Sequence, residues 1–65
     1  MDNNYFRIFM GIIADYGMRE TAADEVAVDV DPVFGNEVQT YIFKNEEMAL
    51  DFIRKEDEVF ELVGA

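Results

Sequence analysis

The chain has 65 residues, of which 15 are Asp or Glu and only five are Lys or Arg, so its formal net charge is −10. This length allows one small domain, spanning residues 1–65. The absence of Cys and His excludes disulfides, thiolate metal sites and the usual nucleophile–base pairs. Six Phe and three Tyr, in a chain that is 51% hydrophobic, indicate a folded domain and not acidic disorder. We therefore expect a folded domain that is not an enzyme.

The first predicted element covers residues 4–16. Its apolar residues recur at the spacing of one helix face: Tyr5, Phe6, Ile8, Phe9, Ile12, Ile13 and Tyr16. This period predicts a helix, with Gly17 placed to end it as a left-handed residue. The alternative is a strand through 5–14 that is apolar on both faces. That strand would leave one face of the sheet bare, which would favour dimerisation.

A β-hairpin is predicted over residues 25–43. Residues 25–31 alternate strictly, with Val26, Val28 and Val30 on one face. Pro32 ends this strand, residues 34–36 supply turn chemistry, and residues 38–43 are again typical of a strand.

The next element is a helix that begins after Asn45, a good N-cap residue. Its expected inner face consists of Met48, Ala49, Phe52 and Ile53. A short strand over 59–63 is expected to pair with the hairpin. The predicted fold is α+β: a small antiparallel sheet with a central β-hairpin packed against one or two helices, in the order α-β-β-α-β or, alternatively, β-β-β-α-β.

The sequence predicts neither a metal site nor a cofactor. Asp29-Val30-Asp31 resembles the opening of a calcium loop, but Pro32 and Val33 follow where a further acid and a glycine are needed. No apolar run is long enough to span a bilayer, and the N-terminus lacks the basic segment of a signal peptide. We expect a cytoplasmic protein. The excess of acids disfavours direct binding to nucleic acid or to anionic membranes.

The excess of carboxylates is itself the strongest functional signal. A net charge of −10 exceeds the magnitude of about 2–8 that suffices to keep a small domain soluble, and self-repulsion destabilises the fold. A basic protein surface would offset this cost. The candidate partner-binding residues are Asp24, Glu25, Asp29, Asp31, Phe34, Glu37, Glu46, Glu47 and Asp51. Glu25, Asp29 and Asp31 are expected to form one solvent-facing row, and Phe34 at the hairpin tip is expected to be an exposed aromatic or, alternatively, a loop residue folded back onto the core.

In size, composition and charge, the whole chain resembles small acidic inhibitors encoded by bacteriophages, such as anti-CRISPR proteins that act as DNA mimics. Inhibitors of uracil-DNA glycosylase are similar in the same respects. No specific motif carries this resemblance. It implies a protein, monomeric or homodimeric, that blocks a basic nucleic-acid-binding protein, for instance a CRISPR effector subunit in the host cytoplasm. A structural or assembly module that acts through an apolar dimer interface is the alternative.

Overall fold

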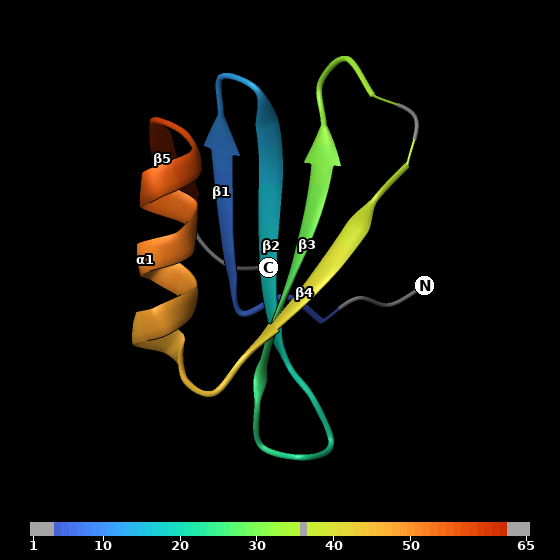
Figure 1. Cartoon of the computed structure of the whole chain (residues 1–65), viewed down its shortest axis with the longest axis vertical. Helices are drawn as coiled ribbons and strands as arrows, with labels where there is room; N and C mark the ends of the chain where they lie inside the picture. Colours follow the sequence, from blue (N-terminus) through green and yellow to red (C-terminus); the bar gives the residue numbers. More distant parts are fainter. Residues whose placement is uncertain (1–3, 36, 63–65) are drawn as a thin grey trace.

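The computed structural model describes residues 4–35 and 37–62. These residues form an α+β domain with a five-stranded antiparallel sheet and one helix (Figure 1). The elements follow in the order β1 (Arg7–Gly11), β2 (Ala14–Glu20), β3 (Val26–Pro32), β4 (Gln39–Phe43), α1 (Glu46–Glu56) and β5 (Val59–Leu62). The order of strands across the sheet is β4-β3-β2-β1-β5. The predicted α+β class is therefore confirmed, whereas the order β-β-β-β-α-β differs from both predicted orders.

The helix predicted over 4–16 is wrong, because these residues belong to an antiparallel hairpin made of β1 and β2. The alternative of one strand through 5–14 is also wrong, since the chain turns back at Ile12 and Ile13. Alternate residues such as Phe9 and Tyr16 face the helix and are buried. Gly17 does not end a helix. It lies inside β2, where the ring of Tyr5 covers it so closely that a Cβ atom would approach the ring to 2.7 Å.

The hairpin predicted over 25–43 is confirmed as β3 and β4, with β3 ending at Pro32. Asn36 in the predicted turn lies outside the described residues. The last strand, predicted over 59–63, is confirmed as β5, with Val63 also outside the described residues. Its predicted partner was wrong, because β5 pairs with β1 at the opposite edge of the sheet from β4.

Helix α1 begins as predicted. The side chain of Asn45 accepts a hydrogen bond of 2.9 Å from the backbone N–H of Met48, which caps the first turn. Ala49 and Ile53 are buried against the sheet, and Phe52 is half-buried. Met48 was assigned to this inner face wrongly, since 49% of its surface is exposed.

One face of the sheet carries the core. Tyr16, Met18, Val28 and Ile53 are the largest fully buried side chains, and they meet between the sheet and α1. The opposite face, which we call the open face, has no helix over it among the described residues (Figure 1). Cross-strand pairs on the open face include Met10 opposite Phe60 and Ile8 opposite Leu62.

Candidate binding site at the hairpin tips

Four exposed apolar side chains lie at one end of the molecule, on two neighbouring turns. Ile12 and Ile13 form the turn between β1 and β2, while Val33 and Phe34 follow the end of β3. The backbone N–H of Val33 donates a hydrogen bond of 2.9 Å to the carbonyl of Ile13, which joins the two turns. We call these four residues the apolar tip. The expected exposure of Phe34 is confirmed, since 94% of its surface is accessible.

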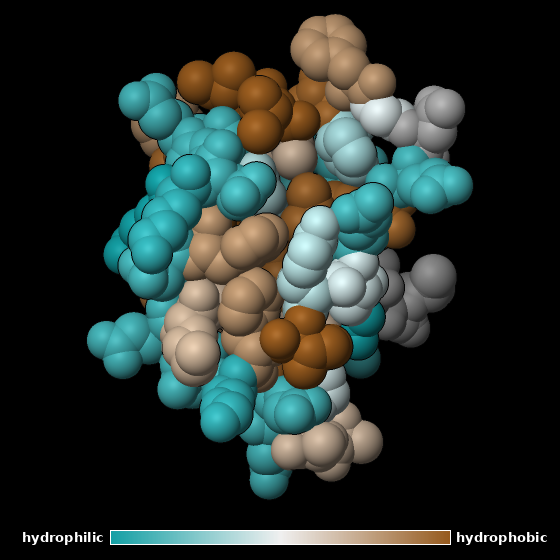
Figure 2. Space-filling model, in the orientation of Figure 1, coloured by the Kyte–Doolittle hydropathy of each residue, from teal (hydrophilic) through white to brown (hydrophobic). Residues whose placement is uncertain are grey.

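Figure 2 shows hydrophobic surface at this end, where Figure 1 places the β1–β2 turn and the β3–β4 loop. Ile12, Ile13 and Val33 are each exposed over half of their surface or more. Single exposed apolar residues are ordinary, but adjacent ones on a rigid support are typical of interaction sites. The apolar tip is therefore a candidate docking surface.

The carboxylate of Asp57 holds the β1–β2 turn in place. Asp57 follows α1 directly, and its two oxygens accept hydrogen bonds from the backbone N–H groups of Ile12, Ile13 and Ala14, at 2.9–3.2 Å. The hydroxyl of Tyr16 donates a further bond of 3.1 Å to the same carboxylate. These bonds fix a turn that lies more than 40 residues earlier in the chain. The part of the apolar tip formed by Ile12 and Ile13 is thus presented rigidly, so little ordering entropy has to be lost there on binding.

The hydrogen bonds around Asp57, which we call the Asp57 clamp, favour its ionised carboxylate. Burial acts to raise the pKa of Asp57, but the N–H donors of Ile13 and Ile12 and the Tyr16 hydroxyl together lower the pKa below its ordinary value. Burial, followed by the hydrogen bond to Asp57, raises the pKa of Tyr16, so its hydroxyl remains a donor. Asp57 is consequently charged at neutral pH, and its oxygens are already occupied by donors of the chain itself.

Two further carboxylates lie beside the apolar tip on the open face. Asp15 and Asp31 are directly opposite each other on β2 and β3 and are both exposed. We call them the acidic pair. Like charges placed opposite in a sheet repel each other, and none of the ion pairs found among residues 4–35 and 37–62 includes either carboxylate. A cation from outside the chain would relieve this repulsion.

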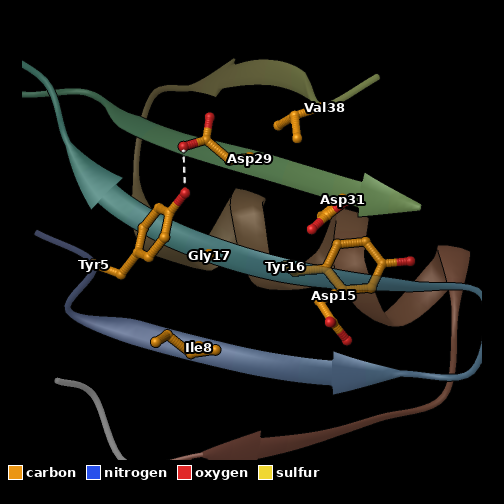
Figure 3. Close-up of a pocket in the computed structure, with 8 residues that line it drawn as sticks. All are labelled: Tyr5, Ile8, Asp15, Tyr16, Gly17, Asp29, Asp31 and Val38. Atoms are coloured by element: carbon orange, nitrogen blue, oxygen red, sulfur yellow. Dashed lines mark hydrogen bonds between the residues drawn. The ribbon is translucent and has the colours of Figure 1, made fainter. Parts of the chain in front are cut away.

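A hollow of about 290 Å³ adjoins the acidic pair (Figure 3). Its walls include the ring of Tyr5 and the aliphatic side chains of Ile8 and Val38, and the acidic pair lies at one end. A lysine or arginine side chain has an apolar stem and a charged head. The hollow suits such a side chain, with the stem against Ile8 and Val38 and the head near the two carboxylates.

The structure corrects the predicted role of Asp29. It was expected to face solvent in a row with Glu25 and Asp31, but only 8% of its surface is exposed. Its carboxylate binds the guanidinium of Arg19, with an Nε–Oδ2 distance of 2.9 Å, and accepts hydrogen bonds from the hydroxyls of Tyr5 and Thr40. The Arg19 guanidinium lowers the pKa of Asp29, and burial together with the Asp29 bond raises the pKa of Tyr5 to about 12. The carboxylate of Asp29 is therefore already bound by side chains of the chain itself, and it stabilises the open face.

The remaining predicted residues are not gathered on one surface. Glu37 is exposed and precedes β4, on the loop that also carries Phe34. Asp24 and Glu25 lie in the β2–β3 loop, at the opposite end of the molecule (Figure 1). Glu46 and Glu47 begin α1 near that same opposite end. Glu46 is paired with Arg7, and Asp51 with Lys55, so these two acids are partly neutralised.

Sequence reasoning missed Ile12, Ile13, Asp15 and Asp57 as parts of the site. The two isoleucines were assigned to a helix face, which concealed that they form a turn. The position of Asp57 carried a usable signal: an acid at the negative end of a helix is unfavourable unless another group binds it. The sequence alone does not say that this group is a turn far along the chain.

Among the described residues, no group of three or more potential ligand side chains could hold a metal ion. The single helix of this part of the chain is too short and too polar to cross a membrane. Comparisons of the chain with protein-family models, with curated proteins and with solved structures find no match.

Proposed function

We propose that the chain is a non-catalytic binding protein that docks its apolar tip and its acidic pair onto a basic nucleic-acid-binding protein. Docking would exclude DNA or RNA from the surface that it covers. The observation that carries this proposal is the adjacency of the two features: Ile13 and Val33 are each two residues from a member of the acidic pair, Asp15 or Asp31.

The arrangement agrees with the usual anatomy of protein interfaces. Most of the binding energy comes from a few buried apolar or aromatic anchors, while charges around them set specificity and association rate. Phe34 is the natural anchor because its ring is almost wholly exposed on a supported turn. The acidic pair supplies fixed negative charge next to this anchor. A partner surface with an apolar pocket and neighbouring Lys or Arg residues would match both features.

Surfaces of this kind occur on proteins that bind nucleic acid, since their affinity depends on Lys and Arg that neutralise phosphates. Carboxylates of the chain would then occupy positions that phosphates take in the natural complex. A phage-encoded anti-CRISPR protein that blocks target-DNA binding is the first form of this proposal. An inhibitor of a DNA-repair enzyme, such as uracil-DNA glycosylase, is the second form.

Competition for labelled DNA tests the proposal. A CRISPR effector complex and a uracil-DNA glycosylase are each bound to labelled DNA, and the chain is titrated in while fluorescence anisotropy is recorded. We expect the chain to displace DNA from one of them. Phe34→Ala should weaken displacement at least about tenfold, which corresponds to 1.4 kcal/mol. The matched control is Phe60→Ala, an aromatic that is 79% exposed on β5 and is not one of the four residues of the apolar tip.

The association rate and its dependence on salt test the acidic pair. Asp31→Lys should slow association and reduce its salt dependence, because steering by opposite charge acts mainly on the association rate. Glu47→Lys makes the same change of charge on α1 and should have a smaller effect.

If Phe34→Ala and Phe60→Ala displace DNA as well as the unchanged chain does, the apolar tip is not the interface. Direct binding of the chain to labelled duplex would contradict the proposal altogether.

A second candidate function is favoured by the open face. Met10 and Phe60 form an exposed apolar cross-strand pair, and Leu62, opposite Ile8, is 41% exposed. An assembly module could bury these side chains against a second copy. Light scattering over a range of concentrations tests this function: a dimer that Phe60→Lys dissociates would support it, whereas a monomer at all concentrations would exclude it.

A further inference from the structure

Strand β4 forms an unprotected edge of the sheet. It pairs with β3 on one side only, and four of its five residues are exposed. Natural sheets usually block such an edge with a charge, a proline or a bulge. Residues 38–43 contain no charged residue and no proline. The other edge strand differs, because β5 carries Glu61, whose carboxylate is bound to Arg7.

A groove runs between β4 and α1. Phe43, Met48 and Phe52 line it, together with Asp51 and Lys55, and its volume is about 300 Å³. The Phe52 ring packs on Tyr41 and Phe43, with centroids 5.0 and 5.1 Å apart, so the floor of the groove is fixed. Figure 2 shows this strip of apolar surface beside the helix. Met48 is half exposed here although it lies next to the core residue Ala49.

The edge and the groove together define the conformation of an occupant. The N–H and C=O groups on the free side of β4 bond best to another extended strand. Alternate side chains of such a strand point to the same face. Those that point toward α1 would enter the groove, where Phe43, Met48 and Phe52 offer apolar contacts.

The net charge of the chain indicates whether the occupant of the edge and the groove is a second copy or another protein. Two copies, each with a net charge of −10, would repel each other over the whole approach. A neighbouring hollow of about 330 Å³ is lined by Glu47 and Asp51, so the rim of the groove is acidic toward the start of α1. Lys55 neutralises Asp51 in part, at 3.5 Å. The remaining charge favours a segment with basic flanks.

We propose that β4 and the groove beside it bind an extended segment of a partner protein as a sixth strand, with an apolar side chain in the groove and basic residues on either side. This inference does not depend on the proposed function, because the apolar tip and the groove are separate surfaces with separate variants.

Amide hydrogen exchange and NMR titration test the proposal with a synthetic peptide that has a central Val-Phe-Val segment between lysines. At about 0.15 M salt, where surface charges are screened beyond about 8 Å, we expect new protection at β4 amides and shifts around Met48. A peptide that is N-methylated at consecutive residues of the central segment keeps every charge but has no free edge with which to add to a sheet. It should bind at least about tenfold more weakly, or 1.4 kcal/mol.

A matched pair of variants tests the groove. Met48→Lys changes a side chain that is 49% exposed in the groove, and Met10→Lys changes one that is 51% exposed on the open face. The two carry the same change of charge, so only a groove site makes Met48→Lys the more harmful. Equal affinity for the methylated peptide, or equal effects of the two variants, would overturn the proposal. So would β4 protection that appears without peptide and grows with protein concentration, which would assign the edge to a second copy.

Discussion

At the scale of single residues, Asp57 links the end of α1 to the turn that carries half of the apolar tip. Each of its oxygens accepts at least two hydrogen bonds, counting the bond from the backbone N–H of Glu58. An asparagine has only one acceptor oxygen, and its NH₂ group would face N–H donors. We therefore expect Asp57→Asn to lower the melting temperature at pH 7 and to speed amide exchange at Ile12 and Ile13.

The effect of Asp57→Asn should depend on pH with a definite sign. Because the folded pKa of Asp57 is lowered, its contribution to stability is present above the unfolded pKa, about 3.9, and is lost as the pH falls through the folded pKa. The difference in melting temperature between the two chains should therefore narrow as the pH falls below about 4. Melts followed by circular dichroism across this range measure it. An unchanged difference in acid would show that the charge of Asp57 is not what holds the turn.

Asp29 and Asp31 differ sharply although they lie two residues apart on the same face. Removing one partner of a buried ion pair costs about 3–5 kcal/mol. The Arg19 side chain is 33% exposed, so for Asp29→Asn we expect a lower cost, about 2–3 kcal/mol. Asp31→Asn removes one of two opposed exposed charges and should leave stability unchanged or raise it slightly. Urea denaturation of both variants makes this comparison, and equal losses would contradict the buried network.

At the scale of elements, the start of α1 depends on Asn45. Replacing an Asn N-cap by Ala costs about 1 kcal/mol because an N–H of the first turn loses its acceptor. We expect Asn45→Ala to reduce the free energy of unfolding by about this amount, and Asn45→Ser to retain most of it, because Ser is also a good cap. Urea denaturation of the two variants measures both values. A loss near zero in Asn45→Ala would show that the Asn45 cap contributes little.

Two elements could be predicted from sequence patterns alone. The alternation of Val26, Val28 and Val30 and the cap at Asn45 act within a few residues, and both predictions were confirmed. The helix predicted over residues 4–16 was wrong because a hairpin that is apolar on both faces can show the same spacing of apolar residues as a helix. One signal pointed the other way: β-branched and aromatic residues dominate this stretch, which favours strands. The Asp57 clamp could not be predicted, since it joins residues distant along the chain.

At the scale of the whole molecule, a few ion pairs hold elements together within a chain whose net charge is −10. Arg7 is bound to both Glu46 and Glu61, which ties β1 to α1 and β5, and these pairs raise the pKa of Arg7. Arg19 and Lys55 each bind one carboxylate. The 15 carboxylates of the chain far outnumber its five basic residues, so most of them have no basic side chain to neutralise them. Self-repulsion thus remains across the surface, alongside these local attractions.

Salt should therefore stabilise the fold. At low ionic strength the repulsion acts over long distances, whereas at about 0.15 M it is screened beyond about 8 Å. Exposed ion pairs such as Lys55–Asp51 also weaken in salt, but such pairs contribute only about 0–1 kcal/mol each. We expect the melting temperature to rise when NaCl is added. Glu56→Lys, which removes an acid from the negative end of α1 and brings the net charge from −10 to −8, should raise the melting temperature at low salt and reduce the gain from NaCl. A melting temperature that falls on adding NaCl would show that the ion pairs outweigh the repulsion, and a basic partner would then not be needed to offset it.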